Sequence, residues 1–237
     1  MAVNKLRPTA NADNTNVGSP SRTGTYNEAY VLPVGTGRHS IALEGSYWTA
    51  GNATPGTALT AHAAPAIADA ETKPIIHIYN GGSTDVVLDY IDILTTVANA
   101  SATAVGFSIY TDAKGSTNRS SGGTAITPVN TRSNSTLSTG LTIYAGAVVA
   151  AGTSPKRVAY RTIKEFIGVA LDRYSFSFGA GLMMTPTTSY TAGATAIVTY
   201  FPPVVLAPNG NLCFCQVSPS GATTAATFEF EMGYWDR

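Results

Sequence analysis

The sequence predicts an all-β fold: an antiparallel β-sandwich with jelly-roll-like connections, an extended N-terminal arm and a long loop over residues 49–72. Three observations predict it. Charged residues make up 12% of the 237 residues, about half the usual share, which leaves few Glu and Lys for exposed helices. Thr, Ser, Asn and Gly supply the polar surface instead, and they favour strands and turns. Short apolar segments separated by turn signals run along most of the chain.

The N-terminal residues 1–25 consist mainly of Asn, Thr, Ser, Pro and Gly. A segment of this composition cannot bury enough apolar surface to form its own core, so we expect an arm that is either disordered alone or ordered against a partner. Residues 26–237 are assigned to a single β-sandwich domain with the 49–72 loop as an insertion. The early cations are followed by no apolar run, and no apolar stretch reaches 18 residues, so we expect neither a secretory signal nor a membrane span.

Apolar residues that alternate with polar ones identify the strands. A first strand is expected at residues 26–34 and a clearer one at 39–48, where Ile41 and Leu43 stand among polar positions. Residues 158–167 fit either a strand or one helical turn. The other expected strands, in chain order, are residues 74–79, 85–94, 103–110, 125–130, 141–149, 174–178, 194–201, 203–206, 212–217 and 227–235.

Residues 49–72 differ from the rest of the chain in their alanine content. Pro55, Gly56 and Pro65 argue against one continuous helix there. A loop of this length inside a compact domain is uncommon and is often functional. We expect an excursion that packs on a neighbouring subunit, and a short helical turn near residues 58–63 is one option for its structure.

Two turns are indicated by glycine next to asparagine. The tripeptide Asn-Gly-Gly at residues 80–82 tolerates positive φ, which a tight two-residue turn requires. It stands between the expected strands 74–79 and 85–94, so we expect a β-hairpin. Pro-Asn-Gly at residues 208–210 predicts a second turn.

The reactive side chains form no known catalytic or metal-binding motif. Cys213 and Cys215 share one face of an expected strand, where a disulfide would be strained, and we interpret them as small buried apolar residues. Of the three histidines, His39, His62 and His77, the last alternates with isoleucines and is interpreted as structural or solvent-facing. A soft-metal site of both cysteines with one histidine is the alternative, but the cysteine spacing is unusual for it.

We therefore expect no enzyme activity, no cofactor and no metal. Glycan hydrolysis is kept as a minor alternative, since it needs paired carboxylates in a cleft and the 14 acidic residues show no recognised arrangement.

The balance of positive and negative charge indicates which partners the protein is expected to have. Lys and Arg total 14 and Asp and Glu total 14, so the formal net charge is zero. A protein that binds nucleic acid through phosphates shows a basic excess, so we expect no direct contact with nucleic acid, and we expect none with membranes. A neutral surface protects poorly against self-association, and interface cores are depleted in charge. The composition therefore favours a subunit of an assembly.

Charged and tryptophan side chains are the candidates for interfaces within such an assembly. The densest basic group lies at residues 156–164, and acidic side chains form a counterpart elsewhere in the chain; a merely solvated surface is the alternative explanation of both. The candidate interface residues are Lys5, Arg7, Lys156, Arg157, Arg161, Lys164, Trp48 and Trp235. The acidic counterpart consists of Asp85, Asp89, Asp92, Glu229, Glu231 and Asp236.

The C-terminal residues 203–236 resemble the closing strands of tailed-bacteriophage virion proteins. They read Pro-Val-Val-Leu-Ala-Pro-Asn-Gly-Asn-Leu-Cys-Phe, then the polar turn Pro-Ser-Gly-Ala at 219–222, then Phe-Glu-Phe-Glu-Met-Gly-Tyr-Trp-Asp. Here Pro-Asn-Gly replaces the plain Pro-Gly that is commoner in those proteins. The resemblance implies a jelly-roll subunit that is made in the host cytoplasm, resides in the virion and is often a homotrimer.

On this resemblance we expect a structural virion protein, foremost a capsid decoration or cement protein that stabilises the head by bridging capsid subunits. Its expected partners are copies of itself in a homotrimer, and the major capsid protein or other virion subunits. The alternative is a tail or fibre component that binds a receptor or glycan through exposed aromatic side chains. Packing in a core or interface is the competing explanation for each candidate aromatic: Tyr47, Trp48, Tyr110, Tyr190 and Trp235.

Overall fold

The computed structural model describes residues 22–23, 29–30, 37–65, 70–97, 104–112, 117–164, 170–179, 196–218 and 224–236. The chain divides into two units, Met1–Ser40 and Ile41–Arg237. In the first unit, β1 (Arg22–Thr23) and β2 (Ala29–Tyr30) pair antiparallel. Most of the expected arm lies outside the described residues, so its extended form and its boundary near residue 25 stay predictions.

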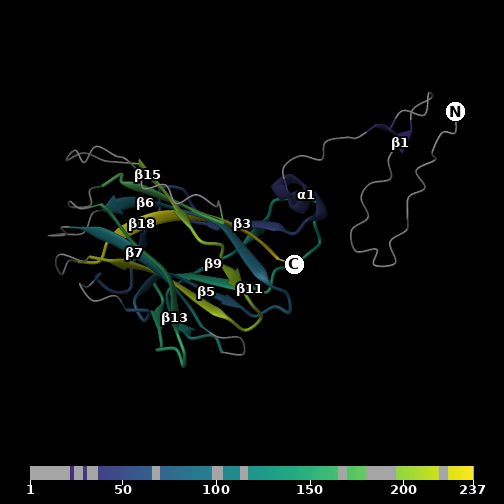
Figure 1. The fold of residues 1–237 in the computed structure, drawn as a ribbon. Coiled ribbons are helices and arrows are strands. Elements are labelled where there is room, and N and C mark those ends of the chain that lie inside the picture. The colour runs from purple at the N-terminus through teal and green to yellow at the C-terminus, as the bar shows by residue number, and fades with distance from the viewer. Residues whose placement is uncertain are drawn as a thin grey trace. The chain divides into compact units, whose positions relative to one another are not determined.

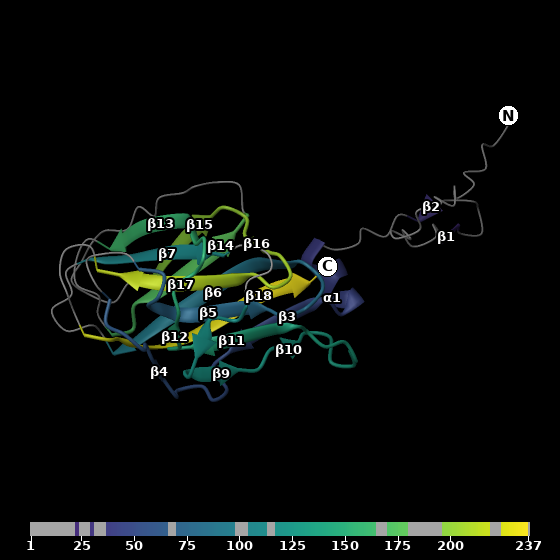
Figure 2. The ribbon, with the colours of Figure 1, turned by 90° about the horizontal axis from the view of Figure 1, so that it is seen from below.

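Two β-sheets form the second unit, and Figures 1 and 2 show them as two layers. The strands of the eight-stranded sheet are β3 (Tyr47–Gly51), β4 (Leu59–Thr60), β6 (Val86–Val97), β10 (Val129–Asn130), β14 (Arg173–Phe178), β15 (Ala196–Phe201), β16 (Val205–Leu206) and β18 (Thr227–Asp236). Those of the six-stranded sheet are β5 (Pro74–Asn80), β7 (Val105–Thr111), β9 (Thr124–Ile126), β11 (Leu141–Ala145), β13 (Lys156–Lys164) and β17 (Asn211–Val217). A separate pair consists of β8 (Ser120–Ser121) and β12 (Val148–Val149).

The strand order confirms the predicted sandwich. The eight-stranded sheet runs β10-β3-β18-β6-β14-β15, with β16 on β6 and β4 on β18, and the six-stranded sheet runs β13-β7-β17-β5-β11-β9. Some consecutive strands change sheet, as β5, β6 and β7 do, whereas β14, β15 and β16 stay in the eight-stranded sheet. Among the described strands, pairing is antiparallel except between β14 and β15, which are parallel.

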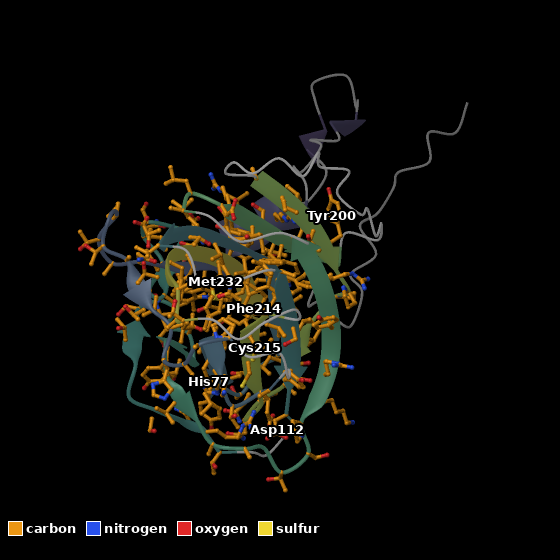
Figure 3. All side chains as sticks on the ribbon, turned by 90° about the vertical axis from the view of Figure 1, so that its left-hand side faces the viewer. His77, Asp112, Tyr200, Phe214, Cys215 and Met232 are labelled. Carbon is orange, nitrogen blue, oxygen red and sulfur yellow. The ribbon has the colours of Figure 1, made fainter. Side chains whose placement is uncertain are left out.

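The core lies between the two sheets, where alternate residues of each strand point inward. An aromatic cluster is at its centre: the Phe107 ring lies 5.0 Å from that of Phe176 and 5.5 Å from that of Phe214. Each of these side chains is at most 1% exposed, and burying one contributes roughly 2 kcal/mol. Figure 3 shows Phe214 together with Met232 of β18 near the middle of the domain.

The strand expected at residues 39–48 is wrong in its first half, because the helix α1 (Gly37–Glu44) occupies it. The helix ends at Gly45, whose φ of +83° suits a C-terminal cap. The Gly45 and Ser46 amides donate to the carbonyls of Ala42 and Ile41 at 3.1 Å each. Leu43 is 66% exposed, so its alternation with Ile41 did not reflect burial on one face of a strand.

The β-hairpin expected at residues 80–82 is also wrong. The strands on its two sides, β5 and β6, belong to different sheets, and neither Gly81 nor Gly82 has positive φ. The Asn80 side chain organises the crossover instead: its Nδ2 donates to the Thr84 and Leu206 carbonyls at 2.8 and 2.9 Å. The expected turn at 208–210 does form, with Asn209 at a φ of +59°.

The described part of the 49–72 segment is attached to the eight-stranded sheet. β3 continues to Gly51, and Leu59 and Thr60 form β4, which pairs with β18. The helical turn considered for residues 58–63 is therefore wrong.

The ambiguous 158–167 segment is strand up to Lys164, where β13 ends. Within the described residues, no helix has the length and apolar character needed to cross a membrane.

Candidate functional site

The outer face of the six-stranded sheet carries a buried polar cluster, here called the Arg119 cluster: Glu71, His77, Asp112, Arg119, Asn211 and Cys213. His77 and Cys213 alternate with core residues on β5 and β17, so their side chains point away from the aromatic core. In Figure 3, His77, Cys215 and Asp112 lie below Phe214 and Met232. Cys213 and Cys215 are free thiols buried with Ala147 and Val149, as the sequence predicted.

Arg119 connects the members of this cluster, and its side chain is only 6% exposed. Nη1 lies 3.3 Å from Glu71 Oε2 and donates to the Ala150 carbonyl at 3.0 Å. Nε lies 3.5 Å from Asp112 Oδ2, and Nη2 is 3.6 Å from Cys213 Sγ. The guanidinium thus joins the loops that contain Glu71, Asp112 and Ala150 to β17.

Two groups of the cluster, His77 and Cys213, have shifted pKa values. Burial, together with the nearby positive charge of Arg119, lowers the pKa of His77 from 6.5 to about 4. Burial raises the pKa of Cys213 to about 12, with Arg119 opposing the shift. Near pH 7 the histidine is therefore neutral and the cysteine is a thiol, which is a weaker nucleophile and metal ligand than a thiolate.

The tautomer of His77 follows from its partner. Asn211 Nδ2 donates to the Thr117 carbonyl at 2.9 Å, which leaves Oδ1 to accept at 3.2 Å from His77 Nε2. His77 Nδ1 is then an unprotonated acceptor, and it is buried with no hydrogen-bond partner in the described part of the chain. Sequence reasoning missed Arg119, because a single arginine in a Ser- and Asn-rich segment is typical of a surface loop.

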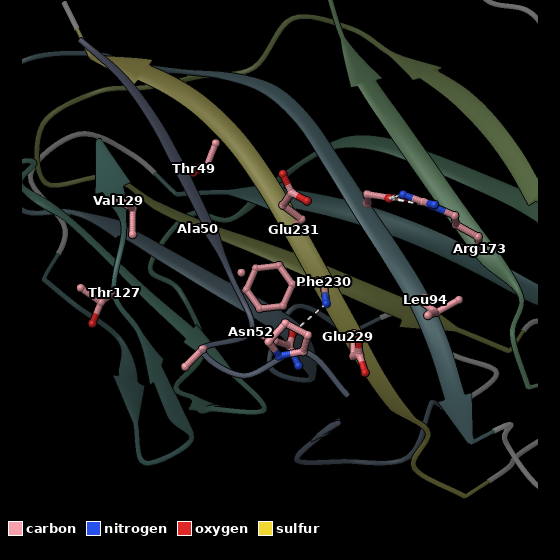
Figure 4. A pocket seen from close by; sticks show the side chains of 14 residues that line it. Thr49, Ala50, Asn52, Leu94, Thr127, Val129, Arg173, Glu229, Phe230 and Glu231 are labelled. Carbon is pink, nitrogen blue, oxygen red and sulfur yellow. Dashed lines mark hydrogen bonds and ion pairs between the residues drawn. The ribbon is translucent and has the colours of Figure 1, made fainter. Parts of the chain in front are cut away.

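A groove of about 530 Å³ lies on the outer face of the eight-stranded sheet and is here called the acidic groove. Figure 4 shows β18 running through it between β3 and β6, with Glu229 and Glu231 on β18. Asp92 of β6 completes its three carboxylates, and Arg173 of β14 is the one cation among the described residues that line the groove. Its remaining lining residues are Thr49, Ala50, Gly51, Asn52, Ala53, Pro55, Leu94, Thr127, Val129 and Phe230.

Hydrogen bonds hold the polar side chains of the acidic groove in place. Asp92 accepts from Arg173 through a close ion pair and from Ser175 Oγ at 2.7 Å. The Tyr90 hydroxyl donates to Glu231 Oε1 at 2.5 Å, and burial together with this bond raises the pKa of Tyr90. Because Arg173 offsets only one of three carboxylates, the groove keeps a negative excess.

At one end of the groove, Asn52 ties the end of β3 to β18. Its Oδ1 accepts from the Phe230 backbone N–H at 2.8 Å, and its backbone N–H donates to the Phe230 carbonyl at 3.2 Å. Figure 4 shows this contact beside Glu229. Val129, at the other side, is 62% exposed and gives the groove an apolar wall.

The predicted basic residues Lys156, Arg157, Arg161 and Lys164 all lie on β13, here called the basic edge. β13 is the terminal strand of its sheet and pairs with β7 alone among the described strands. Lys156 and Arg157 are exposed, and the Arg157 guanidinium lies 5.7 Å from the centre of the Tyr160 ring. The pairing with β7 is irregular at two places, and irregularity and positive charge both discourage uncontrolled strand addition at an edge.

The two tryptophans have different environments. Trp48 is a core residue rather than an interface residue: it is 5% exposed, and its Nε1 donates to Asp236 Oδ1 at 3.2 Å. Trp235 is half-buried and stacks on Tyr47, with ring centres 6.3 Å apart. Tyr110 is half-buried and packs beside Cys213 and Cys215.

The acidic counterpart divides into two kinds of residue. Asp92, Glu229 and Glu231 come together in the groove. Asp89 is 2% exposed and accepts from the Tyr47 hydroxyl at 2.6 Å, so it serves the internal structure. The candidates Lys5, Arg7 and Tyr190 lie outside the described residues.

Among the described residues, no group of three or more His, Cys, Asp and Glu side chains is arranged to hold a metal ion. No protein-family model, curated protein or solved structure matches the chain.

Proposed function

We propose that the chain is a structural protein of a tailed-bacteriophage virion, foremost a capsid decoration protein that stabilises the head by bridging capsid subunits. One observation supports this most: a β-sandwich with few charged residues gathers carboxylates in the acidic groove and cations along the basic edge. Opposed charged surfaces on a rigid scaffold suit specific association between subunits. Both His77 and Cys213 are buried, and burial holds Cys213 as the less reactive thiol.

The mechanism is multivalent attachment. A rigid sandwich holds several contact segments at fixed positions, so that once one contact forms, the others occur at high effective concentration. Contacts that are weak alone then hold neighbouring capsid subunits together against the pressure of packaged DNA. The N-terminal arm, residues 1–25, and the 49–72 segment are the proposed contacts with capsid subunits.

Deletion of residues 1–25 tests this mechanism. The shortened protein is expected to keep the unfolding transition of the sandwich but to bind empty heads at least tenfold more weakly, because one contact of a multivalent set is lost. Co-sedimentation of the purified protein with empty heads of the encoding phage measures the affinity. A shortened protein that decorates heads as tightly as the full chain would overturn the role of the arm.

A tail or fibre component that binds a receptor glycan is the second candidate. The acidic groove favours it, because 530 Å³ falls within the usual size of small-ligand sites and Asn52, Glu229 and Glu231 offer hydrogen-bonding groups. Glycan-array binding that disappears in Glu231→Ala would support this candidate over capsid decoration.

A further inference from the structure

We propose that the acidic groove of one copy receives the basic edge of a second copy of this chain. The contact deepens the proposed function by naming the surfaces through which subunits associate. It concerns self-association alone, so it can be tested without phage heads.

The groove supplies the negative partner. Glu229, Glu231 and Asp92 stand together on adjacent strands, and Arg173 forms its ion pair with Asp92. Glu231 is exposed, and it accepts a hydrogen bond from the neutral Tyr90 hydroxyl. A positively charged side chain that enters the groove therefore finds two carboxylates, Glu231 and Asp92, already held by hydrogen bonds, which lowers the entropy cost of binding.

The basic edge supplies the positive partner. Lys156 and Arg157 project from the exposed end of β13. Val158, the next residue of the strand, is 38% exposed. A guanidinium can bind a carboxylate with two parallel hydrogen bonds. Val158 matches the apolar wall that Val129 gives the groove, so the contact combines charge pairing with apolar burial.

The two surfaces of one copy cannot meet each other. The basic edge belongs to the six-stranded sheet, whereas the groove is on the outer face of the eight-stranded sheet, across the core. The contact therefore forms between two copies, with the acidic groove of one against the basic edge of the other. Two copies can exchange such contacts around a twofold axis, and larger sets close into a ring or continue as a filament. The expected homotrimer is one such ring.

Charge reversal tests the contact. The groove variant is Glu229→Lys with Glu231→Lys, the edge variant is Lys156→Glu with Arg157→Glu, and the fourfold variant carries all of these changes. Like charges opposed at a contact cost several kcal/mol, so each double variant is expected to weaken self-association at least about a hundredfold and to be monomeric. The fourfold variant restores opposite charges and is expected to regain the wild-type mass.

Light scattering at low and at high salt, with circular dichroism to verify folding, gives the masses. The matched control is Lys73→Glu, an exposed reversal away from both surfaces, which is expected to leave the mass unchanged. Double variants with the wild-type mass, a folded fourfold variant that stays monomeric, or a monomeric wild type that binds a glycan in the groove would each overturn the proposal. In the last two cases the proposed virion role still stands if the protein binds heads.

Discussion

Replacing Arg119 by leucine is expected to lower the free energy of unfolding by about 3–5 kcal/mol, because it leaves two buried carboxylates without their cation. The side chains of Glu71 and Asp112 are 12% and 1% exposed, so water cannot replace the guanidinium. The lost bond to the Ala150 carbonyl also releases a loop that covers the outer face of the six-stranded sheet. Denaturant unfolding measures the loss, which is a large share of the 5–15 kcal/mol typical of a domain.

The matched control is Arg132→Leu. Arg132 is exposed and donates to the Leu43 carbonyl and to Asn134, so its loss is expected to cost about 1 kcal/mol or less. Equal unfolding midpoints for Arg119→Leu and the wild type would show that the Arg119 cluster does not hold the loops on the sheet.

Acid is expected to destabilise the fold through His77. The unfolded chain takes up a proton near the ordinary pKa of 6.5, whereas the folded chain resists it until about pH 4. The unfolded state thus binds more protons between these values, so stability is lost as the pH falls through this window. From pH 7 to 4.5 the loss assigned to His77 is roughly 2–3 kcal/mol.

The variant His77→Gln removes this titration and keeps a side-chain donor for Asn211. Between pH 7 and 4.5, the unfolding free energy of His77→Gln is expected to fall by roughly 2–3 kcal/mol less than that of the wild type. His62→Gln, which changes an exposed histidine, is expected to keep the wild-type pH dependence. Parallel pH profiles for the wild type and His77→Gln would contradict the buried, uncharged state of His77.

Alternation of apolar and polar residues was enough to locate most strands. It identified β14, because that strand has one face in the core and its side chains alternate accordingly. Alternation failed at residues 37–44. The exposed Leu43 gives the sequence a strand-like pattern there, but the segment is a helix that ends at Gly45, whose positive φ suits a C-terminal cap. Alternation also cannot reveal which strands pair, so the turn at residues 80–82 was taken for a hairpin although it connects the two sheets.

The candidate surfaces were predicted in part. The basic edge was visible as a cluster within nine consecutive residues. From the sequence alone, the acids of the groove were grouped with Asp89 and Asp236. Only the fold shows that Asp89 and Asp236 differ from them, because these two accept internal hydrogen bonds from Tyr47 and Trp48. The Arg119 cluster was missed, since its members are spread from residue 71 to residue 213 and meet only through the packing of loops over the sheet.

The solution mass of the purified full-length chain tests most directly whether it assembles through its own surfaces. Light scattering at low ionic strength is expected to give a particle near three times 24.5 kDa, and added salt is expected to shift it toward the monomer, because salt screens exposed charge pairs. A strict monomer at every protein and salt concentration would contradict self-assembly through the acidic groove and the basic edge.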